Sequence, residues 1–117
     1  MGSSLSTSSS MPTAESRAKV QHLIQDNKVV VFAKVSCPYC VATKALLKRK
    51  GIDYTSINVD TTSGGTTIFN TVKEMTGQRT VPNIFIAQQQ IGGNSELQAL
   101  NRTGDLDEML RKAGALA

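Results

Sequence analysis

The chain has 117 residues, a formal net charge of +4, two cysteines and no Trp. This length allows one domain around one hydrophobic core. The positive charges are spread along the chain without interleaved aromatic residues, and no apolar run approaches the ~18 residues of a membrane span, so we expect neither nucleic-acid binding nor stable membrane insertion. A small secreted domain would usually carry more cysteines. We therefore expect a monomer in a reducing compartment, the cytoplasm.

The first twelve residues, MGSSLSTSSSMP, are Ser-rich and contain little that could be buried. They are predicted to form a disordered leader before a single folded domain over residues 13–117. Three explanations of the leader are open. It is a cloning scar before a native start at Met11, a weak organelle leader without the usual Arg, or an N-myristoylation signal formed by Gly2 and Ser6.

A helix and a central strand are predicted next. Thr13 is a suitable N-cap for a helix over residues 14–26, whose buried face would include Ala18, Leu23 and Ile24. Residues 29–33, VVVFA, form a continuous apolar run rich in β-branched side chains. Such a run is typical of a strand that is covered on both faces of its sheet.

Both cysteines follow this strand directly. Cys37 and Cys40 lie in the segment KVSCPYC over residues 34–40, and the next ten residues favour a helix that Gly51 would end. Residues 53–59 alternate well enough to form a second strand. A strand, a helix and a strand at this spacing predict a parallel pair of strands.

The rest of the chain predicts further elements of an α/β domain. The Gly64-Gly65 pair is not followed by Lys-Ser or Lys-Thr, so it is not a phosphate-binding loop. A helix is expected over residues 66–75, then a strand over 83–87 that forms a hairpin with a short strand at Ile91. Two helices close the domain, the first capped by Asn94 or Ser95 and the second by Thr103.

The cysteine pair has the properties of a redox site. Cys37 falls at a helix N-terminus, where free N–H groups and the helix dipole favour a thiolate, and Lys34 adds positive charge. Cys40 lies one helical turn further along. We therefore expect Cys37 to attack disulfides and Cys40 to resolve the mixed disulfide, without a metal. The alternatives are half of a zinc site, for which the chain lacks further ligands, and a pair of ordinary thiols.

Four motifs, in this order, resemble those of dithiol glutaredoxins in the thioredoxin superfamily. They are Lys34, Cys37-Pro38-Tyr39-Cys40, Thr80-Val81-Pro82 and Ile91-Gly92-Gly93-Asn94-Ser95. The resemblance runs from about residue 14 to the C-terminus. It implies a thioredoxin-like α/β fold, with a four-stranded mixed sheet flanked by about five helices. It also implies a glutathione-disulfide oxidoreductase that uses glutathione as co-substrate and reduces protein disulfides and glutathione mixed disulfides.

Two other functions compete with this one. Some glutaredoxins are iron–sulfur cluster carriers, in which a dimer would hold the cluster through Cys37 and glutathione. A thioredoxin reduced by a flavoprotein is disfavoured, because no Trp precedes Cys37 and the glycine-pair motif is present.

The resemblance further implies which residues bind glutathione. Lys34 would hold a carboxylate, the backbone of Val81 before a cis proline would pair with the tripeptide, and the helix start at Gly93 would bind the second carboxylate. Thr80 would serve equally well as a turn residue. The implied set is Lys34, Cys37, Tyr39, Gln78, Thr80, Val81, Pro82, Gly93, Asn94 and Ser95.

Two positions depart from the pattern of the family. Glu96 stands where Asp is usual, and its longer side chain is expected to reach the ammonium group of glutathione differently. Phe69 occupies the position of a polar residue, often Gln, near the glycine carboxylate. This change removes one expected hydrogen bond to glutathione.

Overall fold

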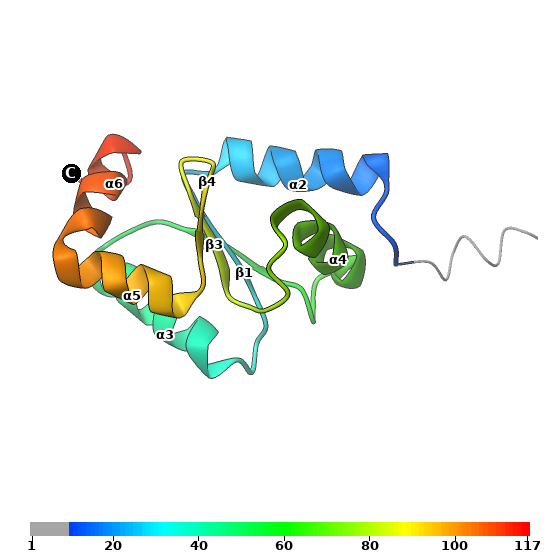
Figure 1. The fold of residues 1–117 in the computed structure, drawn as a ribbon, viewed down its shortest axis with the longest axis horizontal. Helices are drawn as coiled ribbons and strands as arrows, with labels where there is room; N and C mark the ends of the chain where they lie inside the picture. Colours follow the sequence, from blue (N-terminus) through cyan, green and yellow to red (C-terminus); the bar gives the residue numbers. More distant parts are fainter. Residues whose placement is uncertain (1–9) are drawn as a thin grey trace, which may run out of the picture.

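The computed structural model describes residues 10–117 (Figure 1). Most of the predicted leader, including Gly2 and the possible myristoylation signal, lies outside the described residues. Ser10 lies against helix α4 (Gly65–Thr76), where its carbonyl accepts a hydrogen bond of 3.0 Å from Asn70 Nδ2.

A mixed four-stranded sheet forms the centre of the molecule, in the order β2-β1-β3-β4. Strands β1 and β2 are parallel, whereas β3 is antiparallel to both β1 and β4. This sheet and its five flanking helices within the described residues confirm the predicted fold class. The strands are β1 (Val29–Ala33), β2 (Thr55–Asn58), β3 (Asn83–Ile86) and β4 (Gln89–Gly92).

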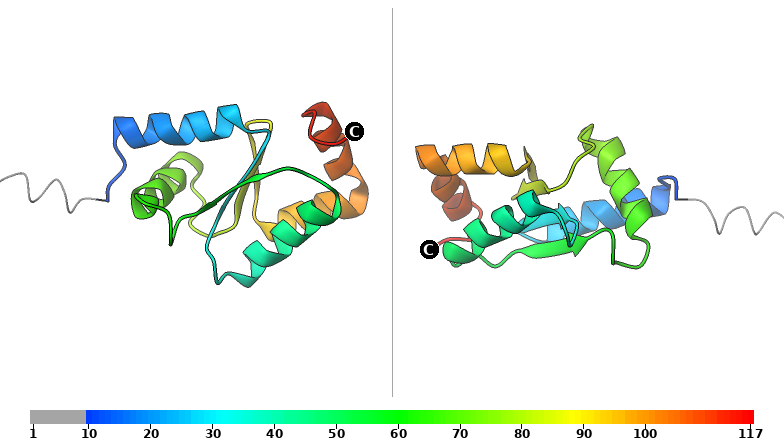
Figure 2. Two further views of the ribbon diagram at one scale, coloured as in Figure 1. Left: turned by 180° about the vertical axis from the view of Figure 1, so that it is seen from behind. Right: turned by 90° about the horizontal axis from the view of Figure 1, so that it is seen from below.

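Helices cover both faces of the sheet (Figures 1 and 2). α2 (Ala14–Asp26) and α4 lie on one face, and α3 (Pro38–Arg49), α5 (Asn94–Thr103) and α6 (Asp105–Lys112) lie on the other. None of the helices within residues 10–117 is both long and apolar enough to cross a membrane.

The sheet separates two hydrophobic cores. Side chains alternate along a strand, so β1 sends Val29, Val31 and Ala33 into the core beneath α3, α5 and α6. Val30 and Phe32 enter the core beneath α2 and α4. All five residues are buried, which explains why β1 is apolar without interruption.

The buried face of α2 differs from the predicted one. Ser16, Val20 and Ile24 are buried, whereas Ala18 is exposed and Leu23 is only half-buried. The Ser16 hydroxyl lies 2.8 Å from the hydroxyl of Thr71 on α4. The buried face thus consists of three residues spaced by four, in which Val20 and Ile24 enter the core and Ser16 contacts α4.

Three element boundaries also differ from the prediction. The β3–β4 turn consists of Ala87 and Gln88, which both have positive φ angles of 48° and 71°, so β4 begins at Gln89. Gly93, not Asn94 or Ser95, is the N-cap of α5. The last helix starts at Asp105 after Gly104, whose φ of +86° is readily adopted only by glycine.

Candidate active site

Strand register brings three distant segments together at one edge of the sheet. Phe32 near the end of β1 pairs with Asn83 at the start of β3. Ile84 on β3 pairs with Gly92 at the end of β4. The cysteine loop after β1, the segment before β3 and the start of α5 therefore lie side by side. These three segments contain the four motifs of the sequence, because Lys34 and the cysteine pair share the first segment.

Cys37 caps the N-terminus of α3. Its backbone is extended, with φ −89° and ψ 114°, and Pro38 occupies the first helical turn, where its missing N–H is not needed. The N–H of Cys40 donates a hydrogen bond of 3.2 Å to Cys37 Sγ. The Cys37 thiol also donates to the carbonyl oxygen of Val81 at 3.7 Å. When Cys37 loses its proton, the N–H donor still stabilises the sulfur.

Cys40 lies in a different environment from Cys37. It is fully buried within the core beneath α3, whereas Cys37 is partly exposed, and both are free thiols. Burial, together with the hydrogen bond to Cys37, raises the pKa of the Cys40 thiol to about 11. Cys40 is therefore protonated at neutral pH while Cys37 remains accessible.

We predict that iodoacetamide at pH 7 modifies Cys37 and spares Cys40 in the folded protein. A raised pKa keeps Cys40 in the thiol form, and only the thiolate is nucleophilic. Intact mass should show one carbamidomethyl group, and peptide mapping should place it on Cys37. Both cysteines should react after unfolding in urea, which serves as the control. Double modification of the folded chain at pH 7 would contradict this assignment.

A cleft of about 590 Å³ lies beside the thiol. It brings together most of the residues that the resemblance implied, and Cys37 borders it through its contact with Val81. The peptide bond between Val81 and Pro82 is cis, as implied. The cleft is lined by Tyr39, Gln78, Thr80, Val81, Pro82, Gly93, Asn94, Ser95 and Glu96.

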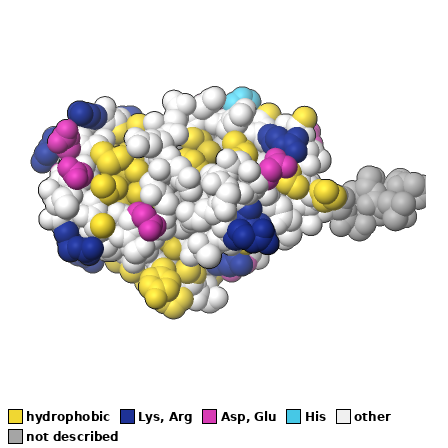
Figure 3. All heavy atoms as spheres, viewed as in Figure 1, with side chains coloured by type: hydrophobic (Ala, Val, Ile, Leu, Met, Phe, Trp, Pro, Cys, Tyr) yellow, Lys and Arg dark blue, Asp and Glu magenta, His cyan; other side chains and the backbone are white. Residues whose placement is uncertain are grey.

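Apolar side chains lie close to Cys37 on the surface. Val35, Tyr39 and Val41 are three of the few exposed large hydrophobic residues in the described chain. Figure 3 shows apolar side chains at the N-terminal end of α3.

Lys34 lies outside the lining of the cleft and contacts Phe69. Its Nζ is 4.8 Å from the centre of the Phe69 ring, and the Nζ of Lys73 is 4.5 Å from the same ring. Neither lysine forms an ion pair within residues 10–117. Two cations thus share one aromatic ring. Phe69 was expected near the site from the sequence and Lys73 was not, although the spacing of four residues on a helix pairs them.

Glu96 folds back onto the start of its own helix. One carboxylate oxygen accepts the N–H of Gly93 at 2.7 Å, and the other accepts the Ser95 hydroxyl at 3.0 Å. Both hydrogen bonds lower the pKa of the Glu96 carboxyl, and the bond from Gly93 has the larger effect. The carboxylate therefore occupies one of the N–H groups that were expected to face a ligand.

Within residues 10–117, no three side chains among His, Cys, Asp and Glu lie close enough together to hold a metal ion.

The site presents a capping thiol, a buried thiol one turn away and a polar cleft at the edge of a mixed sheet. This arrangement defines a thiol–disulfide oxidoreductase of thioredoxin-like fold.

The family model described as Glutaredoxin matches residues 29–91. Glutaredoxin of Vernicia fordii is 43% identical over 98 residues, which cover 84% of this chain and 94% of the relative. Glutaredoxin-C2 of Arabidopsis thaliana is 42% identical over 99 residues, covering 85% and 89%. The chain belongs to the glutaredoxin family.

Solved structures agree with this assignment. A wheat glutaredoxin superposes with a TM-score of 0.85 at 42% identity, covering 91% of this chain and 98% of that one. A buckwheat glutaredoxin–glutathione complex superposes with a TM-score of 0.83 at 39% identity, covering 91% and 100%.

Proposed function

We propose that this glutaredoxin uses glutathione to reduce protein disulfides and glutathione mixed disulfides. The observation that carries the proposal is the position of Cys37 Sγ, at a helix N-terminus and in contact with Val81 of the cleft. The buckwheat relative forms a complex with glutathione, which supports glutathione as the ligand of the corresponding cleft.

The reaction with a mixed disulfide needs only the first cysteine. The Cys37 thiolate attacks the glutathione sulfur, the substrate S–S bond breaks, and the protein sulfur leaves with the electron pair and takes up a proton. Glutathione is then bonded to Cys37. A second glutathione thiolate attacks this mixed disulfide, which releases oxidised glutathione and restores Cys37.

A protein disulfide needs both cysteines. After attack by Cys37, the substrate protein remains bonded to it, and Cys40 must displace it by forming the intramolecular disulfide. Cys40 starts as a buried thiol with a raised pKa, so its proton must leave as its sulfur attacks. Two molecules of glutathione then reduce the Cys37–Cys40 disulfide and become oxidised glutathione.

Three groups around the cleft suit the parts of glutathione. The backbone of Val81 offers an N–H and a carbonyl for β-type pairing with the peptide. The N–H groups at the start of α5, at Asn94 and Ser95, suit one carboxylate. Lys34, which has no carboxylate partner among the described residues, suits the other.

The direct test is turnover of a glutathionylated peptide coupled to glutathione reductase. We expect the parent chain to turn over the peptide in the presence of glutathione and not in its absence.

The iron–sulfur alternative makes a different prediction, namely a brown dimer with visible absorption after anaerobic reconstitution with iron, sulfide and glutathione. Cluster binding without turnover would overturn the proposed enzymatic function.

We predict that Lys34→Ala raises the KM for the glutathionylated peptide about fivefold. It removes a cation three residues before Cys37, and a charge-assisted hydrogen bond at a partly exposed site is worth about 1 kcal/mol. Lys73→Ala is the matched control, because it removes a cation from the same ring but from the last turn of α4. Initial rates at 0.05 and 0.5 M NaCl should show the Lys34 effect shrinking with salt. Equal effects of both variants would contradict a specific role for Lys34.

A further inference from the structure

A chain of amide side chains links β3, β4 and the segment before β3. Asn83 is buried, and its Nδ2 donates to the hydroxyl of Thr76 at 3.2 Å. Gln90 Nε2 donates to Asn83 Oδ1 at 3.1 Å and to Gln78 Oε1 at 3.2 Å. Both N–H groups of the Gln90 amide are therefore used inside the protein.

Gln78 extends this chain to the backbone of the cleft. Its Nε2 donates to the carbonyl of Thr80 at 3.1 Å and to that of Pro82 at 2.9 Å. Both N–H groups of this amide are thus also used. Although Gln78 lines the cleft, its donors hold the two carbonyls that flank Val81.

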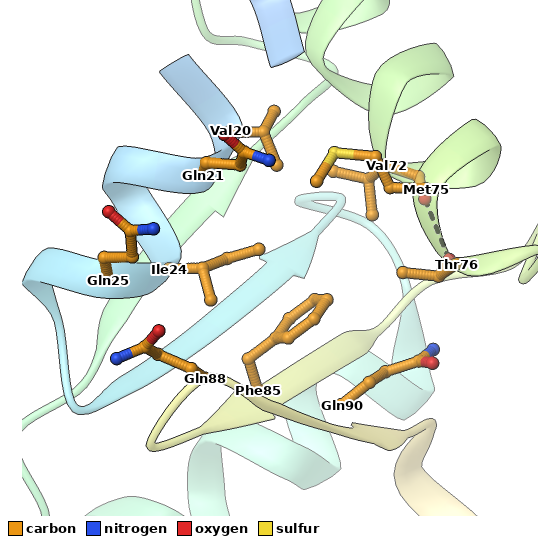
Figure 4. Close-up of a pocket in the computed structure, with 10 residues that line it drawn as sticks. All are labelled: Val20, Gln21, Ile24, Gln25, Val72, Met75, Thr76, Phe85, Gln88 and Gln90. Atoms are coloured by element: carbon orange, nitrogen blue, oxygen red, sulfur yellow. Dashed lines mark hydrogen bonds between the residues drawn. The ribbon is translucent and has the colours of Figure 1, made fainter. Parts of the chain in front are cut away.

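The network starts on the side of the sheet away from the cysteines. Figure 4 shows Gln90 and Thr76 at one end of a second pocket, between α2, α4 and the β3–β4 hairpin. Thr76 is fixed there because its hydroxyl donates to the Val72 carbonyl at 2.8 Å. The network thereby connects the end of α4 and strand β4 to a segment that touches Cys37.

The held segment is the one on which the reaction depends. Val81 accepts the Cys37 thiol through its carbonyl and lines the cleft with Thr80 and Pro82. In the described structure, neither Asn83 nor Gln90 has a hydrogen bond to either cysteine. The hydrogen bonds that connect these two amides to the reacting thiol run through Gln78 and the segment that contains Val81.

We propose that Gln90 and Asn83 are positioning residues, which act through Gln78 to hold the Val81 backbone where glutathione pairs with it. This inference rests on the proposed function. Loss of the Gln90 amide leaves Gln78 without its anchor to β4, so the segment 80–82 samples more positions. Glutathione must then order this segment on binding, which weakens binding without altering Cys37 itself.

Gln90→Ala tests the proposal, with Gln89→Ala as the matched control. Gln89 is an exposed residue of the same type on the same strand, and its side chain has no hydrogen bond in the described structure. For Gln90→Ala we expect a fivefold rise in the KM for the glutathionylated peptide, with kcat and the alkylation rate of Cys37 within twofold of the parent chain. Gln90→Glu should match Gln90→Ala, because a carboxylate keeps the shape but has no N–H donor. Gln89→Ala should leave all three quantities unchanged.

Backbone motion at Val81 provides a readout that does not need turnover. We expect the 15N order parameter of the Val81 amide to fall from about 0.85 in the parent chain to below about 0.6 in Gln90→Ala, with no change in Gln89→Ala. A KM for Gln90→Ala equal to that of Gln89→Ala overturns the positioning role, whatever the order parameter. An equal loss of kcat and Cys37 alkylation also overturns it, since the effect would then lie at the sulfur. If the parent chain does not turn over the peptide, the proposed function fails, and an unchanged order parameter at Val81 would separately refute the network.

Discussion

Cys37→Ser is expected to lower kcat/KM for both glutathionylated peptides and protein disulfides by at least about a thousandfold. The hydroxyl of serine is not ionised near neutral pH, so no nucleophile remains at the helix N-terminus. Cys40 cannot replace it, because that thiol is fully buried and protonated. Initial rates in the glutathione-coupled assay measure the loss.

Cys40→Ser is the informative partner of this variant. It should retain turnover of the glutathionylated peptide within about threefold, because a second glutathione can release the product from Cys37. It should lose reduction of an intramolecular protein disulfide and instead accumulate a covalent adduct with the substrate, visible by intact mass. If Cys40→Ser were as inactive as Cys37→Ser toward the glutathionylated peptide, the single-thiol route would be wrong.

Gly65→Ala is expected to cost the fold about 3 kcal/mol or more of unfolding free energy. Gly65 opens α4 and is buried, and a Cβ there would lie 2.0 Å from the Val59 carbonyl oxygen and 2.8 Å from its carbon. These are backbone atoms, and the Val59 N–H is itself bonded to the Ala33 carbonyl at 2.8 Å. The helix must therefore move away from the sheet, which opens the core that it covers.

Gly64→Ala is the control for this substitution. Gly64 has the open surroundings that its neighbour Gly65 lacks, but its φ is +71°. Alanine at Gly64 should therefore cost only about 1 kcal/mol of backbone strain. Urea unfolding followed by far-ultraviolet circular dichroism would measure both values. Equal losses for the two variants would show that moving helix α4 costs no more than the backbone strain at Gly64, which would contradict the prediction.

Much of the fold could be predicted because its signals are local. The apolar run over 29–33 marks a central strand, and the position of Cys37 before Pro38 marks a helix start. The errors concern choices that local patterns leave open. Ala18 and Ser16 are both compatible with a helix interior, and the burial of Val20 and Ile24 together with the contact to Thr71 on α4 places Ser16 inward.

Caps were ambiguous for a similar reason. Asn94 and Ser95 are favourable cap residues by type, yet Gly93 takes the position because Glu96 supplies the acceptor for its N–H. The Gly64-Gly65 pair was likewise visible in the sequence. Which of the two is required by close packing depends on the distance of α4 from Val59.

By itself, the sequence determined the class of chemistry: two cysteines one helical turn apart, a nearby lysine and the motifs of a glutathione cleft. These features depend on residue type and short spacing, which folding does not change. Only the tertiary structure decided which groups meet across the sheet. The contact of Cys37 with Val81 joins residues 44 positions apart, and the bond of Gln90 to Gln78 depends on the β3–β4 register. Register and helix placement arise from the packing of the whole core, so no local pattern specifies them.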